Sequence, residues 1–584
     1  MELRQKTFIN NPKLTQKLIN ALNKNNIHHT VLILLVVAVS FTGLFNHDLW
    51  TPDEPRVAAI SLEMERNGNI VIPHLAGQPF IEKPPLYFAV AAGFISILGP
   101  VMGNTQSIRL VSALFGLGTL IITFFLARRL SGNLCALSAV FVLGTMAGFV
   151  GNFHRIRVDP ALCFYVMAAT ASFAEAYIAN RPWFLVPAGL SLAGAFLSKG
   201  LIGPLLVAIP WGGMFFLLLT QEKARVAKNE FFLLQHVICA MVFVFFSGIW
   251  IIQMRISGGQ ELWHEWFWVN HVGRLSGVTT QKGHMRPGEY FYYFKVLSRY
   301  TMPWLPLIFI WLVSVCKQLV TQKHISKENI LLLVWVGGTL LLLSLSATKR
   351  SVYFIPILPA FAIICSAALH KALPQWFKGY VVSLLVLCAV IMALLSTLPL
   401  TYSLWMGIIP GPMANFPQKA GLGNIISALG LLTCIFLIIK RKRFSAEISL
   451  TMATALLCIS IFTGPVKAMD LEKSMQKTVT EYYAQIPAEQ RPKVAGLNFS
   501  ETMRAYFYYY CDWSVPQIRN PNRIKKIMAS IDPDYDSVIV TDKKLDRLEQ
   551  LKSLYRIIGE SHPSETNRKR KTYWVTGLEP DRKL

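Results

Sequence analysis

Residues 329–347 read NILLLVWVGGTLLLLSLSA, a run of 19 positions without one ionisable side chain. A helix of about 20 predominantly apolar residues is long enough to cross the hydrocarbon core of a bilayer. Outward from this run, twelve further apolar runs occur along the chain. We therefore predict a polytopic α-helical membrane protein with about 13 spans, near residues 30–49, 109–127, 132–151, 160–179, 183–197, 202–220, 231–252, 297–316, 329–347, 352–370, 380–400, 422–439 and 446–464.

The composition excludes a soluble multidomain protein. Of the 584 residues, 53% are hydrophobic and only 15% are charged, whereas soluble domains carry about 25% charged residues. The net charge of +25 indicates basic loops near anionic lipid, and no nucleic-acid partner is expected. Of the nine cysteines only Cys511 lies in the polar tail, which excludes a disulfide within that tail and any zinc-finger spacing.

The distribution of basic residues predicts which loops lie on each side of the membrane. With the N-terminus inside, the inner segments carry 20 Lys and Arg in 70 residues, and the outer loops before the tail carry 14 in 140. This difference follows the positive-inside rule. The apolar run 85–101 begins and ends at prolines, and counting it as a span would move the basic residues 128–129 and 440–443 outside. We therefore expect it to be a helix lying along the interface.

Three regions follow from this topology: a cytoplasmic basic N-terminus (1–29), a membrane-embedded domain (30–464) and a soluble outer domain (465–584). The first span has no small-residue cleavage site after it and is expected to be retained. The tail alternates β-rich and helix-prone stretches, which predicts a small α/β domain. The expected strands are Lys493–Leu497, Ser537–Thr541 and Lys571–Thr576, and the expected helices are Glu501–Tyr508, Asn522–Ser530 and Lys543–Leu551.

The unusual polar motifs all fall in outer loops. Asp53 and Glu54 form an acidic pair at the membrane boundary, where desolvation raises carboxylate pKa values and suits a general base or a cation ligand. An acidic helix start is the alternative. Glu82 and Lys83 place an acid and a base before two prolines, and a surface ion pair explains them about as well.

Further loops supply cations. Arg157 and Asp159 lie between spans three and four, and guanidinium groups match phosphate oxygens. Lys199 lies in a minimal loop, where snorkelling to the interface is the alternative. In the long outer loop a tryptophan cluster is typical of an interfacial belt, so only His271 and Arg274 are candidates there.

A sixth motif opposes the charge rule. Lys349 and Arg350 lie outside, with Tyr353 following, and an anion gives a reason for two outer cations. Taken together, the six motifs predict one pocket that binds a phosphate at the membrane surface, with an acid or base nearby. We count Lys349 and Arg157 among the phosphate ligands, and Glu54 as a second catalytic candidate.

The run LWTPDEPRVAAISLEMERNGNIVIPHLAGQPFIEKPPLYF resembles the first outer loop of the bacterial lipid A aminoarabinose transferases and their relatives in the protein O-mannosyltransferase superfamily, the GT-C glycosyltransferases. RIRVDP, FLSKG, FWVNHVGR and KRSVYFIPILP follow in the family's order, over roughly residues 30–400. The resemblance implies a multi-pass protein of the bacterial inner membrane with a periplasmic active site. The implied donor is a sugar on a polyprenyl phosphate, with no nucleotide cofactor, and the implied acceptor is lipid A, another glycan or a protein.

The resemblance also implies residue roles. Asp53 takes the acid or base position, and Asp159 matches the acid of the second loop. Glu82 and His271 match a pair that holds a divalent metal, with zinc expected before magnesium or manganese. The residues implied to surround the carrier phosphate are Lys83, Lys199, Arg274 and Tyr353.

One departure leaves the sugar and the use of a metal open, because aminoarabinose-branch relatives carry an acid where this chain has Asn270. A protein or cell-envelope glycan mannosyltransferase of the same superfamily is the nearest alternative. A non-enzymatic polyprenyl-lipid transporter is another, although the spans lack the mid-membrane charges that relays require. A lipid-binding subunit that works through its tail is the third.

Overall fold

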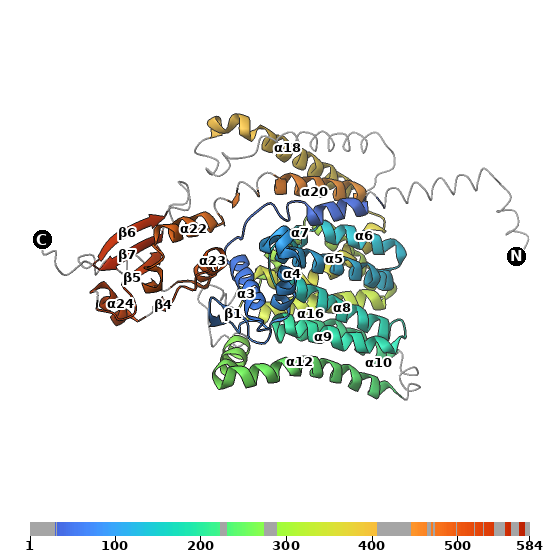
Figure 1. Cartoon of the computed structure of the whole chain (residues 1–584). Coiled ribbons are helices and arrows are strands. Elements are labelled where there is room, and N and C mark those ends of the chain that lie inside the picture. Colours follow the sequence, from blue (N-terminus) through green and yellow to red (C-terminus); the bar gives the residue numbers. More distant parts are fainter. Residues whose placement is uncertain are drawn as a thin grey trace, which may run out of the picture.

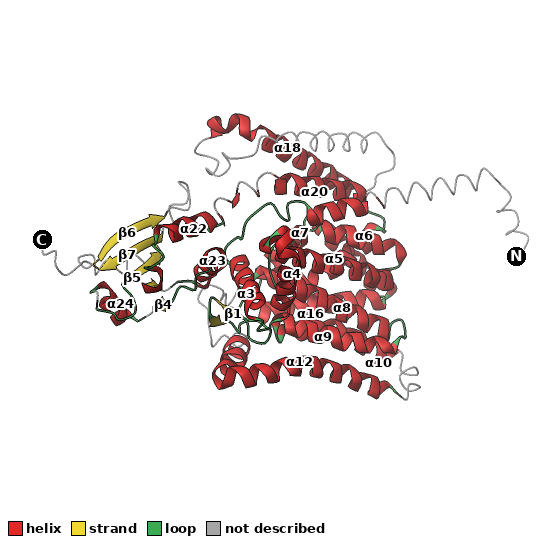
Figure 2. Cartoon of the chain, viewed as in Figure 1, coloured by secondary structure: helices red, strands yellow, loops and turns green. Residues whose placement is uncertain are grey.

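A computed structural model shows a helical bundle with a small mixed domain at one end (Figures 1 and 2). The residues that it describes are 30, 32–221, 231–273, 289–405, 446–463, 466, 469–470, 473–497, 499–518, 520–529, 531–541, 555–561 and 572–577.

Within these residues, seven helical segments are long and apolar enough to cross a membrane, or eight if one bent pair is counted as a span. The chain is therefore a multi-pass membrane protein, as predicted. The long segments are α5 (Asn104–Ser131), α10 (Ile202–Gln221), α12 (Phe232–Trp263) with the π-helix η2 (His264–Val272), α15 (Leu305–Gln322), α16 (Lys327–Leu345), η3 (Ser351–Ile357) with α17 (Leu358–Leu369), and α18 (Gln375–Trp405).

Other predicted spans form shorter or less apolar helices. These are Leu32–Phe41, α8 (Asp159–Tyr177), α9 (Leu185–Lys199) and α20 (Ala446–Thr463). The predicted span 422–439 and the basic residues 440–443 lie outside the described residues.

Two predicted spans are broken, and for these the sequence prediction of one continuous helix was wrong. The run 132–151 forms α6 (Asn133–Thr145) and α7 (Ala147–Phe153), bent by 62° at Met146, whose backbone is extended. The run 297–316 is divided between α14 (Tyr292–Tyr300) and α15, because Pro303 has no N–H to continue a helical ladder. Both breaks lie next to each other, since Ala147 N donates to the Met302 carbonyl at 3.0 Å.

The apolar helix α4 (Leu86–Met102) agrees with the predicted interfacial helix. Lys83, just before it, lines the cavity described below. Just after it, Thr105 hydrogen-bonds Tyr509 of the C-terminal domain at 2.9 Å. Both ends of α4 therefore lie at the same end of the bundle, as a helix along the interface requires.

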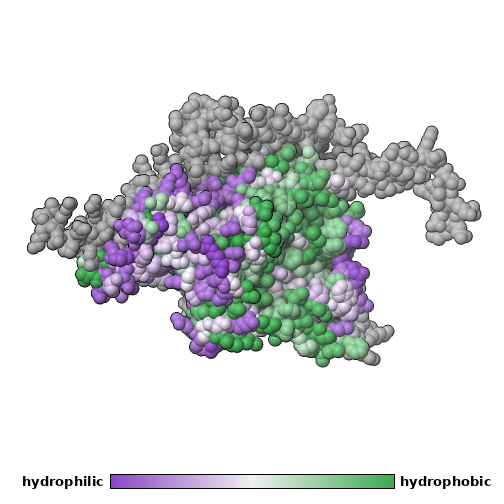
Figure 3. All heavy atoms as spheres, in the orientation of Figure 1, coloured by the Kyte–Doolittle hydropathy of each residue, from purple (hydrophilic) through white to green (hydrophobic). Residues whose placement is uncertain are grey.

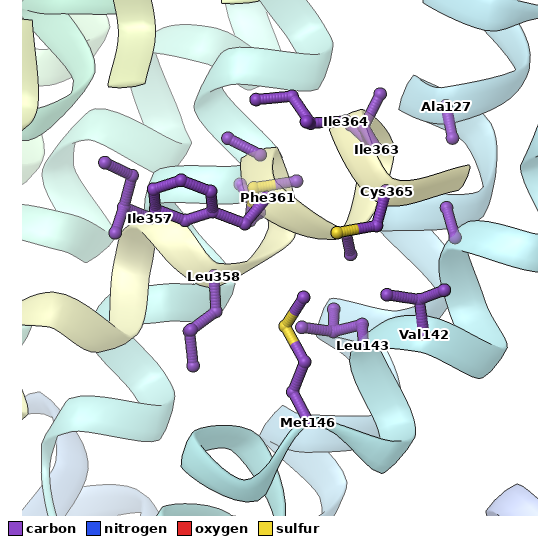
Figure 4. Close-up of a cluster of buried hydrophobic side chains, with 14 of the residues drawn as sticks. Ala127, Val142, Leu143, Met146, Ile357, Leu358, Phe361, Ile363, Ile364 and Cys365 are labelled. Atoms are coloured by element: carbon purple, nitrogen blue, oxygen red, sulfur yellow. The ribbon is translucent and has the colours of Figure 1, made fainter. Parts of the chain in front are cut away.

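Packing between helices holds the bundle together. At the end of α6, Leu143 and the following Met146 lie beside Leu358 and Cys365 of α17, and all four side chains are fully buried (Figure 4). In lipid there is little hydrophobic drive between helices, so close van der Waals packing carries their association. Figure 3 shows the result as an apolar band with hydrophilic residues at both edges.

The C-terminal domain is the predicted α/β unit. Its five-stranded sheet has the order β4-β3-β5-β7-β6, parallel where β3 pairs with β4 and β5, and antiparallel where β7 pairs with β5 and β6. The elements are α22 (Gln476–Gln485), β3 (Val494–Leu497), α23 (Glu501–Cys511), β4 (Gln517–Ile518), α24 (Pro521–Met528), β5 (Ser537–Thr541), β6 (Tyr555–Ser561) and β7 (Thr572–Gly577). The expected helix Lys543–Leu551 lies outside the described residues.

This domain packs on the first outer loop, which forms α3 (Asp53–Asn67) and the short strands β1 (His74–Leu75) and β2 (Gln78–Pro79). Helices α3, α4, α22 and α23 share one hydrophobic cluster. Tyr506 of α23 donates to the Leu49 carbonyl at 2.6 Å, and Glu501 pairs with Arg56 at 2.6 Å. The tail therefore supports the loop that carries the acidic motif.

Candidate functional site

A cavity lies where the loops at one end of the bundle meet. Its polar lining carries four cations and three carboxylates. These are Lys83, Arg157, Lys199 and Arg350, and Asp53, Glu82 and Asp159. The sequence predicted six of these seven as functional residues, and Tyr353 and His271 line the same cavity. Loops separated by up to 297 positions thus form one site, with one more positive than negative side chain.

The other wall of the cavity is apolar. Leu201, Ile202 and Leu205 of the α10 region face Leu342 and Leu343 of α16 across it. Leu201 and Leu205 are each 40% exposed at the surface of the bundle. A ligand with a charged end and a hydrocarbon chain matches a cavity that has one charged wall and one apolar wall.

Asp53 is the centre of the ion pairs. As the first residue of α3 it is buried, and its carboxylate lies 2.7 Å from Arg56, 3.0 Å from Arg350 and 3.5 Å from Arg157. Burial raises the pKa of Asp53, but the attraction of Arg350, Arg157, Lys83 and Arg56 outweighs it and holds that pKa far below its usual range. Asp53 is therefore a fixed anion and a poor proton acceptor.

For Lys83, burial affects the pKa more than the neighbouring charges do. Burial lowers its pKa, and the neighbouring Glu82 only partly offsets this. An ammonium group whose hydration shell has been removed gains strongly from an added anion. Lys83 is thus suited to bind a phosphate.

Lys199 ends α9 and links two loops. Its ammonium group forms an ion pair with Asp159, the first residue of α8, and lies 4.4 Å from the centre of the Tyr353 ring. This cation–π contact fixes the lysine against the cavity wall. The sequence alternative of a snorkelling lysine does not describe this geometry, because the side chain is nearly buried.

Gly200 follows, in a conformation that side chains rarely adopt (φ +71°). An added Cβ there would lie 1.9 Å from Nε2 of His271. Nδ1 of His271 lies 2.7 Å from the Trp266 carbonyl, five residues earlier in the π-helix. If Nδ1 donates to that carbonyl, Nε2 carries the lone pair of the neutral ring.

Glu82 and His271 are the predicted metal ligands, and both line the cavity. The tautomer just described is the one that binds metals. However, no group of three or more His, Cys, Asp or Glu suited to a metal occurs in the described part of the chain. The pair fits a metal only if substrate oxygens complete the coordination.

Glu54 does not have the catalytic position that the sequence suggested. It is 1% exposed and does not line the cavity. Its carboxylate accepts hydrogen bonds from Trp50 N at 2.7 Å and Ile156 N at 2.9 Å, and it lies 3.4 Å from the fully buried Arg109. Glu54 therefore joins the first two outer loops to α5.

Lys349 also requires a correction. It is 3% exposed, it lies off the cavity, and its ammonium group donates to the Ser346 carbonyl at 2.6 Å. The cation of this motif that faces the cavity is Arg350, because adjacent residues of an extended segment point in opposite directions. Nothing in the amino-acid sequence distinguishes Lys349 from Arg350 as the cation that faces the cavity. Arg274 lies outside the described residues.

Arg157 lines the cavity, as the sequence predicted. One guanidinium nitrogen donates to Asn152 Oδ1 at 3.0 Å, and another faces Asp53. Arg157, Arg350 and Lys83 therefore converge on the same carboxylate, and a ligand anion in the cavity meets all three.

Comparisons with known proteins agree with the motifs. The profile of the dolichyl-phosphate-mannose-protein mannosyltransferase family matches residues 82–250. An undecaprenyl phosphate-alpha-4-amino-4-deoxy-L-arabinose arabinosyl transferase of Pectobacterium atrosepticum is 26% identical over 409 residues, covering 68% of this chain and 66% of that protein. A second such transferase, from Pseudomonas fluorescens, is 30% identical over 352 residues, covering 56% and 57%. The chain thus matches 66% of the length of the first of these curated relatives and 57% of the second, less than two thirds in each case.

The fold is shared with a solved structure. ArnT from Cupriavidus metallidurans bound to undecaprenyl phosphate superimposes with a TM-score of 0.68 at 17% identity, covering 93% of this chain and 97% of that one. The resemblance to lipid A aminoarabinose transferases and the predicted GT-C fold class are therefore confirmed.

Proposed function

We propose that this chain is an integral-membrane glycosyltransferase that moves a sugar from a polyprenyl-phosphate donor to an acceptor such as lipid A, on the periplasmic side of a bacterial inner membrane. The observation that carries the proposal is the cavity itself, in which a cluster of cations and carboxylates meets an apolar wall. The names of the relatives, which act from undecaprenyl phosphate, support the same donor.

The donor phosphate binds to the cations. Lys83, Lys199 and Arg350 lie on three different loops and surround the polar end of the cavity. Tyr353 packs under Lys199 and completes the wall. The polyprenyl chain lies along the leucines of α10 and α16, with its hydrocarbon toward the lipid. The excess positive charge favours the anionic carrier over a neutral lipid.

The reaction is a single displacement. An acceptor oxygen attacks the anomeric carbon, the bond from that carbon to the phosphate oxygen breaks, and the configuration inverts. Negative charge grows on the leaving phosphate, so cations that are already in place lower the barrier. Their positions are fixed by Asp53 and Asp159, which require no rearrangement during the reaction.

The low pKa of Asp53 changes the role expected for it. A general base works best with a pKa near the operating pH, and Asp53 lies far below that. We assign Asp53 to holding Arg56, Arg157 and Arg350 in place. This assignment favours an acceptor whose nucleophile is already anionic, such as a lipid A phosphate, because such an acceptor has no proton to give up.

A divalent ion, if bound, has Glu82 and His271 as its protein ligands and supplies positive charge to the substrate oxygens. The position of the His271 ring, fixed through Nδ1, supports this pairing. Lys83 and Lys199 line the same cavity and oppose a second cation. The ion is therefore expected to bind together with the substrate and not before it.

The family profile favours one alternative, transfer of mannose or another hexose to a protein or envelope glycan. It uses the same donor chemistry, but a hydroxyl acceptor must give up its proton to a base, which an anionic acceptor does not require. We expect Asn270, which lines the cavity beside His271, to contact the sugar in either case.

Mass spectrometry of lipid A and envelope glycans, from a host with and without the gene, tests the function. We expect one pentose-sized or hexose-sized addition that depends on the gene, and on Arg350 but not on Lys349. Purified protein should transfer the same group from a polyprenyl-phosphate sugar. Identical glycan profiles in both hosts, together with measurable polyprenyl-lipid translocation in vesicles, would instead support a transporter.

A further inference from the structure

A second basic pocket lies at the end of the bundle opposite the candidate site. It forms where α5, α8 and α9 meet, and three arginines line it: Arg128, Arg129 and Arg181. On α5, Arg109 lies at the site end, where it donates to the Asp48 carbonyl at 2.8 Å. Arg128 lies 19 residues further along the helix, about 28 Å at about 1.5 Å per residue. That distance is close to the thickness of the hydrocarbon core, so this pocket lies at the other membrane interface.

The charges in the pocket do not balance. Glu175 of α8 is its single acid. Arg129 approaches Glu175 with two nitrogens, at 2.9 and 3.0 Å, and Arg181 approaches it at 3.3 Å. Arg128 is exposed and forms no ion pair with any residue that the structure describes. Two of the three arginines thus share one carboxylate, and the charged side chains that line the pocket sum to a net charge of +2.

The remaining lining is apolar. It consists mainly of Ile122, Phe125, Ala168, Ala171, Phe184 and Pro187. Phe125 is 55% exposed, so this wall faces the lipid and not the interior of the bundle. A soluble anion gains nothing from contact with these apolar side chains, whereas an acyl chain packs against them.

We propose that this pocket binds the phosphodiester headgroup of an anionic glycerophospholipid from the leaflet opposite the candidate site. Guanidinium groups donate paired hydrogen bonds to phosphate oxygens. Basic pockets between transmembrane helices are known to hold such headgroups. The excess of two charges suits a lipid with two phosphodiesters, and it disfavours a zwitterionic lipid, whose amine meets the arginines. The inference does not depend on the proposed function.

Lipid binding to the purified chain in detergent tests this site. The probes are cardiolipin, phosphatidylglycerol, phosphatidylethanolamine and inorganic phosphate. Binding of each probe is measured by native mass spectrometry and by the change in the unfolding temperature of the protein. The test protein carries Arg128→Gln and Arg181→Gln, which leave the two-nitrogen pair of Arg129 with Glu175 intact. Lys317→Gln is the control for charge alone, because Lys317 is an exposed cation of α15 that does not line the pocket. Lys83→Gln is the control for binding at the candidate site.

We expect cardiolipin and phosphatidylglycerol to bind and to raise the unfolding temperature of the wild type. Each arginine removed should weaken that binding about fivefold, while both control variants keep it. Unchanged affinity in the double variant would overturn the proposal. So would equal binding of phosphatidylethanolamine or of inorganic phosphate, or a loss confined to Lys83→Gln.

If the double variant does not fold, Arg128→Gln alone decides the question. Arg128 is exposed and pairs with no described residue, so its replacement is not expected to affect folding. A fivefold weaker binding of cardiolipin supports the site, and wild-type affinity contradicts it.

Discussion

The carboxylate of Asp53 accepts two hydrogen bonds from the Arg350 guanidinium, at 3.0 and 3.1 Å, although the two residues lie 297 positions apart. The pair connects the first outer loop to the loop before α17. Because Arg56 and Arg157 contact the same carboxylate, the geometry of several cavity cations depends on one acid.

Asp53→Asn is expected to reduce transfer by about 10²-fold or more. The amide keeps the shape but not the charge, so Arg350 and Arg157 are no longer held, and a misplacement of about 1 Å costs about this much. Steady-state transfer, measured beside circular dichroism to check folding, gives the answer. Wild-type turnover in this variant would remove Asp53 from the site.

The pH dependence separates a fixed anion from a base. Since the pKa of Asp53 is lowered in the folded protein, its contribution to stability is present above the unfolded pKa of about 3.9 and is lost as the pH falls through the folded value. The difference in unfolding temperature between wild type and Asp53→Asn should therefore stay constant from pH 8 to 5. The ratio of their transfer rates should also stay constant there. A ratio that falls with a midpoint between pH 5 and 7 would identify Asp53 as a titrating base.

Gly200→Ala should disable the site through contact with His271. The new methyl group would lie 1.9 Å from Nε2, and the backbone conformation at Gly200 adds about 1–3 kcal/mol of strain. Gly259→Ala is the matched control, because Gly259 has similar backbone angles (φ +67°, ψ −167°, against φ +71°, ψ −149° at Gly200) and no atom within 4 Å of the added carbon. Gly200→Ala should destabilise the protein more than this control does.

Adding His271→Ala to Gly200→Ala should recover the excess loss of stability, since it removes the clash and leaves only the strain. A double-mutant cycle of unfolding temperatures measures this coupling. Strictly additive effects would show that the two residues do not touch.

Glu54→Gln is expected to lower stability by about 3–5 kcal/mol, because it leaves Arg109 buried without its charge partner. Transfer per folded molecule should stay near the wild-type value, since Glu54 does not line the cavity. Chemical unfolding and active-site titration distinguish the two effects. A catalytic Glu54 would give the reverse result, with intact stability and lost turnover.

Chelation tests the metal proposal. If Glu82 and His271 hold a divalent ion, a chelator should lower wild-type transfer, and added zinc, magnesium or manganese should restore it. Glu82→Ala should show the same loss and no further response to the chelator. Full activity after exhaustive chelation would remove the metal and leave His271 as a contact to substrate.

Much of the site was predictable from the sequence. Spans of membrane length fix which loops share an interface, so Asp53, Lys83, Asp159 and Lys199 were expected to meet. Local detail was not predictable. Whether Lys349 or Arg350 faces the cavity depends on one step of extended backbone, and the burial of Glu54 depends on Arg109, which looks like an ordinary span-end cation in the sequence.

In the fold, too, the elements were predictable from the sequence and the local detail was not. Hydropathy predicts that the run 297–316 is apolar, but the break before α15 depends on one proline and on packing against α7. The α/β domain was predicted from its alternating pattern. Its contact with α3 was not, because the aromatic residues of α23 give no indication of their partner.

Binding of polyprenyl phosphate to three proteins tests the central claim, that the cavity cations hold a lipid phosphate. The proteins are wild type, Arg350→Gln and its neighbour variant Lys349→Gln, measured by fluorescence quenching in the same detergent. Loss of a charge-assisted hydrogen bond costs about 1.5–3 kcal/mol, so Arg350→Gln should bind about tenfold to a hundredfold more weakly, while Lys349→Gln binds like the wild type. Equal affinity for Arg350→Gln and the wild type, or a loss found in Lys349→Gln instead, would contradict the account.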